Sequence, residues 1–252
     1  MDHNYFEKEY SIHYYETGRR QELKITSLMN YFEEVALLQS EERKVGLDYY
    51  QKNQVVWMLH KWDITIHKFP VFGQRILVRT LPVSMAGFMG YRRFWVFDSA
   101  GNTLVSATSA WIFVNTRNKR PIRVTDDMKQ AYRNEDRPEN KLDMADIPAL
   151  QKTDFSRGFY VRQADIDINR HVNNVRYVDW ALEALPPDMQ QEYRLENIRI
   201  VFKRETTYGQ MIESQVEMRD GDGKKCSLHK ILDEQGREAC ALSIKWQPFE
   251  PA

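Results

Sequence analysis

The chain repeats one pattern twice, and this repeat restricts its possible folds more than any other feature of the sequence. Four matches recur in the same order at an offset of 135 or 136 positions: Ile64–His67 with Ile200–Lys203, Gly73-Gln74 with Gly209-Gln210, Asp98–Gly101 with Asp233–Gly236, and Trp111 with Trp246. A nearly constant offset indicates a duplicated unit of domain size. Because there are only two copies, the chain is not a solenoid.

Each copy begins with a short strand and continues with a long helix. We expect the two strands at 10–15 and 158–162. Apolar residues then recur at helical spacing: Met29, Phe32, Val35 and Ala36 in the first copy, and Val175, Val178, Ala181, Leu182 and Leu185 in the second. Thr26 or Ser27 is the expected N-cap of the first helix, and Pro186-Pro187 is expected to stop the second.

Strands follow the helix in each copy. Residues 239–246 alternate at strand period, and the Asp-to-Gly segments at 98–101 and 233–236 predict hairpin turns. A helix covering one face of an antiparallel meander makes each copy an α+β unit. We expect a first domain at 1–125 and a second at 155–252. The linker between them, 126–154, is charged and rich in proline, with one short helix near 126–132 and a middle, 133–140, that cannot build a core.

The composition excludes several classes of function. Acidic and basic residues balance at 36 each, and no basic motif with aromatic residues appears, so we expect no nucleic-acid partner. No apolar run is long enough to span a membrane, and the first residues resemble neither a signal peptide nor a transit peptide, so we expect a cytoplasmic protein. Cys226 and Cys240 are expected to be free thiols.

The segment Asp165–Asn174 contains the most informative polar residues. Asp167, Asn169 and His171 stand at alternate positions, which share one face of an extended chain. A carboxylate, an amide and a titratable ring suit acyl transfer, and the N-terminus of the following helix adds positive potential. The alternative is that these residues are turn formers and caps. One histidine without a second His or Cys at ligand spacing is a poor metal set, so we expect no metal and no cofactor.

This segment, extended to Tyr177, resembles the signature of the acyl-acyl-carrier-protein (acyl-ACP) thioesterases of plant plastids and their bacterial relatives. Phe202-Lys-Arg-Glu-Thr206 is similar to that family's strand ending in Tyr-Arg-Arg-Glu-Cys. The resemblance extends over nearly the whole chain, including residues 27–34, 57–70 and 107–111. It implies two fused hotdog domains, of which the first binds the acyl chain and the second is catalytic.

The resemblance implies that Asp167, Asn169, His171 and Glu205 are catalytic. Thr206 stands where plant members have a cysteine, and a threonine hydroxyl lacks the nucleophilicity of a thiolate. A Cys-His mechanism is therefore excluded. The first helix lacks the Asp-x-Asn-x-His pattern, so one active site is expected. It would hydrolyse fatty-acyl thioesters and so end chain elongation.

Two further sets of residues are candidates for substrate contacts. The expected acyl-binding residues come from the first helix and the strand after it: Met29, Phe32, Ala36, Trp57 and Met58. An acidic acyl carrier protein requires a basic docking site, and the densest basic cluster is Arg117, Lys119, Arg120 and Arg123. Each set also has a purely structural interpretation. The apolar residues could simply pack in the core, and the basic residues could form an ordinary solvated surface. Coenzyme A thioesters remain alternative substrates, and a monomer or a homodimer is expected.

Two other functions compete with hydrolysis. A hotdog dehydratase or hydratase also uses Asp and His as base and acid, but Glu205 and the whole-chain resemblance argue against it. A catalytically inactive acyl-binding or regulatory protein would bind ligand without turnover. The intact set of Asp, Asn, His and Glu argues against this function.

Overall fold

A computed structural model of the protein describes residues 4–133, 142, 144–168, 170–221 and 224–249. The chain forms two compact units, Met1–His60 with Ile66–Met144, and Lys61–Thr65 with Ala145–Ala252. The elements of the first unit are, in chain order, β1 (Phe6–Ser11), η1 (Tyr14–Glu16), α1 (Ile25–Glu42), α2 (Leu47–Asn53), β2 (Val55–Ile66), β3 (Arg75–Ala86), β4 (Met89–Phe97), β5 (Thr103–Asn115), β6 (Arg120–Pro121) and α3 (Asp126–Ala131). Lys61–Thr65 of β2 are the part of this strand that belongs to the second unit.

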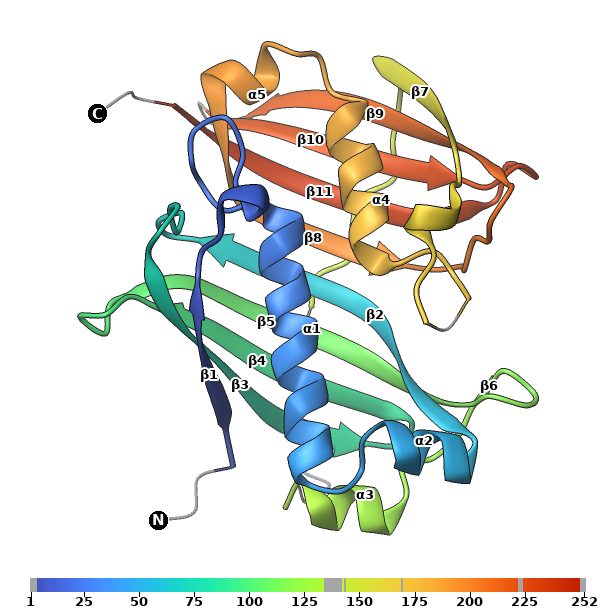
Figure 1. Ribbon diagram of the computed structural model, residues 1–252. Helices are drawn as coiled ribbons and strands as arrows, with labels where there is room; N and C mark the ends of the chain where they lie inside the picture. The colour runs from blue at the N-terminus through green and yellow to red at the C-terminus, as the bar shows by residue number, and fades with distance from the viewer. Residues whose placement is uncertain (1–3, 134–141, 143, 169, 222–223, 250–252) are drawn as a thin grey trace. The chain divides into compact units, whose positions relative to one another are not determined.

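The second unit repeats the main elements of the first. They are β7 (Phe155–Tyr160), η3 (Gln163–Asp165), α4 (Asn174–Glu183), α5 (Met189–Glu192), β8 (Tyr193–Phe202), β9 (Met211–Gly221), β10 (Lys224–Leu232) and β11 (Glu238–Pro248). The strand order is β1-β3-β4-β5-β2 in the first unit and β7-β9-β10-β11-β8 in the second (Figure 1). The two orders correspond strand by strand, as the repeated sequence pattern predicts. Each unit is a hotdog domain, a helix packed on an antiparallel sheet.

The long helix of each unit packs on one face of its sheet (Figure 1). The core of the first unit includes Phe32 of α1, whose ring lies 5.0 Å from that of Phe94 on β4. In the second unit, Val178 of α4 and Ile200 of β8 are fully buried. The predicted hairpin turns are present, because Asp98 and Asp233 accept hydrogen bonds from backbone N–H groups within their turns and Gly101 and Gly236 have positive φ.

The first strand of each copy lies earlier in the chain than predicted. β1 and β7 end at Ser11 and Tyr160, because η1 and η3 turn the chain out of the sheet. The predicted N-cap of the first helix is also wrong. Lys24 occupies that position, and its N–H donates to the carbonyl of Glu16. α4 ends at Glu183, shortly before Pro186-Pro187, so that Leu185, which was expected to belong to this helix, lies beyond its end.

The predicted linker is attached to both units. α3 is the short helix expected there, and Met128 and Tyr132 are buried in a cluster of the first unit with Phe113. Further along, Gln151 N donates to the buried carboxylate of Glu217 on β9 at 2.6 Å. Residues 134–140, expected to build no core, lie outside the described residues. The domain limits at 125 and 155 stay a prediction.

Two sequence-based expectations concern cysteines and membranes. Cys226 and Cys240 are free thiols, as expected. Among the helices of the described residues, none has the length and hydropathy to cross a bilayer.

Candidate functional site

The segment expected to carry the catalytic residues forms a tight turn between η3 and α4. Ile166 and Val172 form an isolated β-bridge. Between them, Asp167 N donates to the carbonyl of His171 at 2.9 Å, and Arg170 N donates to the carbonyl of Asp167 at 3.1 Å. The premise of an extended chain with alternating faces is therefore wrong. The hydrogen-bonded turn, not strand geometry, brings Asp167 near His171.

His171 and Glu205 lie side by side. Nε2 of His171 is 3.1 Å from Oε2 of Glu205, and their side chains are 26% and 33% exposed. The backbone N of His171 lies 3.4 Å from Oδ1 of the half-buried Asp167, which is longer than a typical N–H···O bond. The structure thus brings together three of the four predicted catalytic residues. Asn169 lies outside the described residues.

A buried hydrogen-bond network holds Glu205 in place. Thr206 is fully buried, and its Oγ1 lies 2.8 Å from the hydroxyl of Tyr177 on α4. Thr206 N donates to the same hydroxyl at 3.1 Å, and its carbonyl accepts from Val172 N at 3.0 Å. Burial raises the pKa of Tyr177, so the phenol stays protonated. These bonds fix the position of Glu205 opposite His171.

Sequence reasoning gave Tyr177 no role, although the residue ends the segment that resembles the family signature. It lies 29 positions before Thr206 and occupies a core position on α4, so no local spacing marks it as part of the site.

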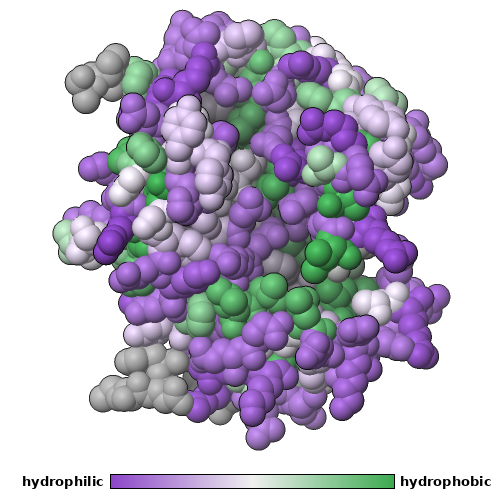
Figure 2. Space-filling model, viewed as in Figure 1, coloured by the Kyte–Doolittle hydropathy of each residue, from purple (hydrophilic) through white to green (hydrophobic). Residues whose placement is uncertain are grey.

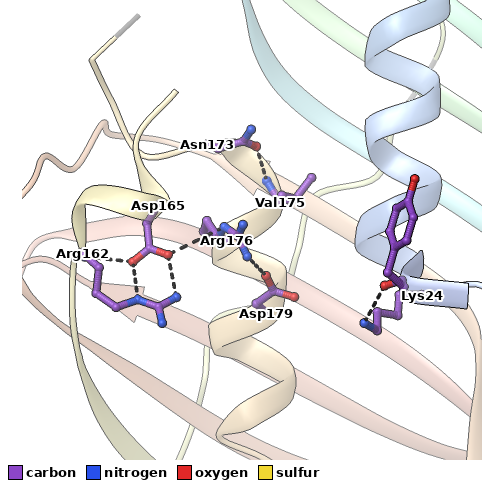
Figure 3. Close-up of polar contacts among 8 residues, drawn as sticks. Lys24, Arg162, Asp165, Asn173, Val175, Arg176 and Asp179 are labelled. Carbon is purple, nitrogen blue, oxygen red and sulfur yellow. Dashed lines mark hydrogen bonds and ion pairs between the residues drawn. The ribbon is translucent and has the colours of Figure 1, made fainter. Parts of the chain in front are cut away.

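Asp165 anchors the start of the turn (Figure 3). Its carboxylate is almost fully buried and accepts from Arg162 N at 2.8 Å and from the Arg162 guanidinium at 2.8 and 3.1 Å. Arg176 lies 3.7 Å away and pairs with Asp179. Burial acts to raise the pKa of Asp165, but hydrogen bonds and charge from Arg162 outweigh it and lower the pKa. Asp165 therefore stays ionised and structural. Asn173 caps α4 by accepting from the N–H of Val175.

The first unit contains the same turn with different side chains. Thr17 and Leu23 form the bridge, Gly18 N donates to the carbonyl of Glu22 at 2.9 Å, and Gln21 N donates to that of Gly18. Gln21 has φ 59°, and Arg170 at the equivalent place has φ 66°. Gly18 and Glu22 thus stand where the second unit has Asp167 and His171.

The partner carboxylate is also missing from the first unit. Leu23 N donates to the carbonyl of Pro70, just as Val172 N donates to that of Thr206. Phe69, the residue before Pro70, therefore occupies the position of Glu205. Among the described residues, only the second unit brings the predicted chemistry together.

The candidate acyl-binding residues differ in accessibility. Met29 and Phe32 are fully enclosed in the core, and Ala36 is nearly so. Trp57 and Met58 are half-buried, and the ring of Trp57 lies 4.8 Å from that of Phe113. Hydrophobic side chains also reach the surface on the face that carries α1 (Figure 2). Trp57 and Met58 can therefore touch a ligand without rearrangement, whereas Met29 and Phe32 cannot.

The candidate docking residues lie together on the surface of the first unit. Arg117, Lys119, Arg120 and Arg123 are all exposed in and around the turn that joins β5 to β6. Asn115 shapes this turn, since its side-chain oxygen accepts from the N–H groups of Arg117 and Asn118. The structure thus supplies a compact basic surface.

The geometry of the His171–Glu205 pair fits general acid-base chemistry. A carboxylate beside an imidazole can take a proton from water while the ring donates to a developing oxyanion. Within the described part of the chain, no group of three or more His, Cys, Asp and Glu residues is arranged to bind a metal ion.

Comparisons with known proteins match both units. Residues 3–132 match the family model described as the acyl-ACP thioesterase N-terminal domain, and residues 149–248 match that of the C-terminal domain. The chain is 26% identical to palmitoyl-acyl carrier protein thioesterase of Cuphea hookeriana over 264 aligned residues. That alignment covers 96% of this chain and 62% of the relative, so the chain spans less than two thirds of the relative's length.

Solved structures share the fold over nearly the whole chain. The 12:0-ACP thioesterase of Umbellularia californica has a TM-score of 0.84 at 22% identity, covering 98% of this chain and 95% of that one. An acyl-ACP thioesterase of Bacteroides thetaiotaomicron has a TM-score of 0.82 at 17% identity, covering 97% and 98% of the two chains.

Proposed function

Because the chain belongs to the acyl-ACP thioesterase family, we propose that it hydrolyses fatty-acyl thioesters, foremost acyl-ACP, to free fatty acid and thiol. The observation that carries the proposal is the contact of 3.1 Å between His171 and Glu205. It arises in the unit that matches the family's C-terminal domain. The equivalent turn of the first unit has the same hydrogen bonds without these side chains.

In the proposed reaction, Glu205 removes a proton from a water molecule whose oxygen attacks the thioester carbonyl. His171 and Asn169 stabilise the oxyanion. The C–S bond then breaks, and the thiolate leaves and takes up a proton. Asp167 has three candidate roles, which are to orient His171, to act as the base, or to attack and form an anhydride. Its position at the backbone N of His171 supports the first role.

The acyl chain is proposed to bind in the first unit, beside Ala36, Trp57 and Met58. Met29 and Phe32 are fully buried in the core of the same unit. A polar cluster limits this region at the C-terminal part of α1. The buried guanidinium of Arg92 donates to Gln39 Oε1 at 2.6 Å and to Thr80 Oγ1 at 3.1 Å. An alkyl chain that displaced these bonds would leave buried polar groups unpaired, which is costly.

The carrier protein is the proposed partner, and the basic surface at 117–123 is one candidate contact, because opposite charge speeds association. Coenzyme A remains an alternative carrier of the acyl group, since its phosphates would also favour basic residues. The cytoplasmic location and the choice between monomer and homodimer rest on the sequence alone.

Thiol release from carrier-protein and coenzyme A thioesters of several chain lengths tests the proposed activity. Glu205→Gln should lower kcat by ~10²–10⁴, the usual loss when a general base is removed. Glu234→Gln, which changes an exposed carboxylate at a hairpin turn, is the control and should retain turnover. Equal rates for both variants would contradict the assignment.

The same assay separates the competing functions. An enoyl thioester that changes ultraviolet absorbance without releasing thiol would indicate a hydratase. Tight fatty-acyl binding with no thiol release from any substrate would indicate an acyl-binding protein.

A further inference from the structure

Four large apolar side chains are exposed around the His171–Glu205 pair. Ile168 is 79% exposed, Tyr208 57%, Met211 51% and Tyr160 50%. Single exposed apolar residues are normal on protein surfaces, but a group of them around a functional site marks an interaction surface.

These side chains belong to the segments that hold the catalytic pair. Ile168 lies in the turn between Asp167 and His171. Tyr208 follows Glu205 by three positions, and its ring lies 6.4 Å from that of Tyr160. Tyr160 is in turn the direct cross-strand neighbour of Met211. Ring contact and strand pairing therefore connect Tyr160, Tyr208 and Met211 to one another, while Ile168 and Tyr208 lie close to the catalytic pair along the chain.

Two positive charges lie within the same segments. Arg170 and Arg204 are exposed and flank His171 and Glu205 in the chain. Among the described residues, neither makes an ion pair. Their basic neighbours are paired, Arg162 with Asp165 and Lys203 with Glu238. Unpaired guanidinium groups remain able to bind carboxylates of a partner.

We propose that Tyr160, Ile168, Arg170, Arg204, Tyr208 and Met211, the site rim, form the surface on which the acyl carrier protein docks. An acidic partner that presents apolar side chains where its thioester arm emerges matches this combination of charge and exposed apolar area. The inference rests on the proposed thioesterase activity. It adds a docking surface beside the site itself, separate from the basic surface at 117–123.

The first unit provides matched controls for the site rim. Phe72 corresponds to Tyr208 and is also exposed, while Gln21 occupies the position of Arg170. The first unit thus shares the exposed aromatic residue of the site rim but lacks the positive charge of Arg170. Because Gln21 adopts the same left-handed backbone as Arg170, Arg170→Gln removes the charge without a new backbone conflict.

The test compares kcat/KM for one acyl chain carried by acyl carrier protein, by coenzyme A and by pantetheine. In the Arg170→Gln/Arg204→Gln variant, kcat/KM for the carrier substrate should fall at least about fivefold relative to that for the pantetheine substrate, and the difference should shrink with added salt. Ile168→Ser should lower the same ratio. Arg19→Gln and Phe72→Ser in the first unit should not change it.

Two results would overturn the docking surface. In the first, kcat/KM for the carrier substrate relative to that for the pantetheine substrate is unchanged in Arg170→Gln/Arg204→Gln and falls instead in Arg117→Gln/Arg123→Gln. The other is an equal loss on all three substrates, which would place the arginines in the active site. The affinity for the holo carrier protein, measured by calorimetry, should be lower in the double variant whether or not turnover occurs. Absence of thiol release would therefore refute the proposed activity separately from the docking surface.

Discussion

Thr206 follows Glu205 directly, yet its side chain is buried against α4, whereas that of Glu205 is partly exposed. The hydroxyl is fully buried and lies 2.8 Å from that of Tyr177. At this position the plant enzymes that the sequence resembles have a cysteine. Here the side chain connects the segment after β8 to α4, and so acts on the site only by holding Glu205 in place.

Thr206→Val should therefore lower stability without removing the chemistry. The loss of a buried hydroxyl partner for Tyr177 is expected to cost ~1–3 kcal/mol of unfolding free energy. Thiol release per folded molecule should stay within about twofold of wild type. Urea unfolding and the thiol assay measure the two quantities, with Thr206→Ser as the variant that keeps the hydroxyl. A large loss of kcat at unchanged stability would instead place Thr206 in the mechanism.

Among the elements, β9 carries a buried carboxylate that binds the segment before β7. Glu217 accepts hydrogen bonds from Arg219 at 2.7 and 3.2 Å and from Gln151 N at 2.6 Å. These bonds, those from Arg219 above all, lower the pKa of Glu217 from an ordinary value of 4.5 to about 2.

The depressed pKa of Glu217 makes stability depend on pH. A carboxyl group whose pKa is lower in the folded state stabilises the fold above its ordinary pKa, and this contribution is lost as pH falls from 4.5 towards about 2. The drop in unfolding free energy between about pH 6 and about pH 3 should be smaller in Glu217→Gln than in wild type. Glu9→Gln, at an exposed position of β1, should behave like wild type. Identical pH profiles for Glu217→Gln and wild type would contradict this role.

The sequence predicted the type and order of the elements better than their limits. Helical spacing located α1 and α4, and the Asp-to-Gly turns located two hairpins, because these signals are local. The ends of β1 and β7 were misplaced, since η1 and η3 depend on hydrogen bonds that the backbone N–H groups of His13 and Arg162 donate to the carboxylates of Glu16 and Asp165, three positions later.

The sequence argument selected Asp167 and His171, but the backbone geometry that it assumed for them was wrong. The residues between Asp167 and His171 were expected to be extended, but a backbone turn brings the two together. The contact with Glu205 joins residues 34 positions apart in the chain, and only the resemblance to a family indicated it. Tyr177 lies at the end of the segment that resembles the family signature, but neither argument gave it a role, because it looks like any core residue of a helix.

At the scale of the molecule, the described parts of two units with the same strand order carry one set of the proposed catalytic side chains. The equivalent positions in the first unit are Gly18, Glu22 and Phe69, which supply no imidazole and no carboxylate pair. The chain should therefore have a single active site.

Matched substitutions in the two turns test the single site. His171→Ala should lower kcat by ~10²–10⁴, as expected for loss of a residue that acts on the reacting proton or oxyanion. Glu22→Ala, at the equivalent place in the first unit, should leave kcat within about twofold. Both are measured by thiol release, with circular dichroism as the control for folding. Residual turnover in His171→Ala that disappears when Glu22→Ala is added would reveal a second site.

The recurrence of this turn also bears on how such a protein can acquire new chemistry. The first unit keeps the loop's hydrogen bonds with a glycine at its start, and a Cβ added to Gly18 would come no closer than 4.0 Å to the Glu22 carbonyl oxygen. The first side-chain atom of an aspartate would thus meet no obstacle at Gly18, and the backbone at Glu22 already has the hydrogen bonds of that at His171. Duplication has left the chain with an unused scaffold, on which selection or design can install another reaction while the working copy is preserved.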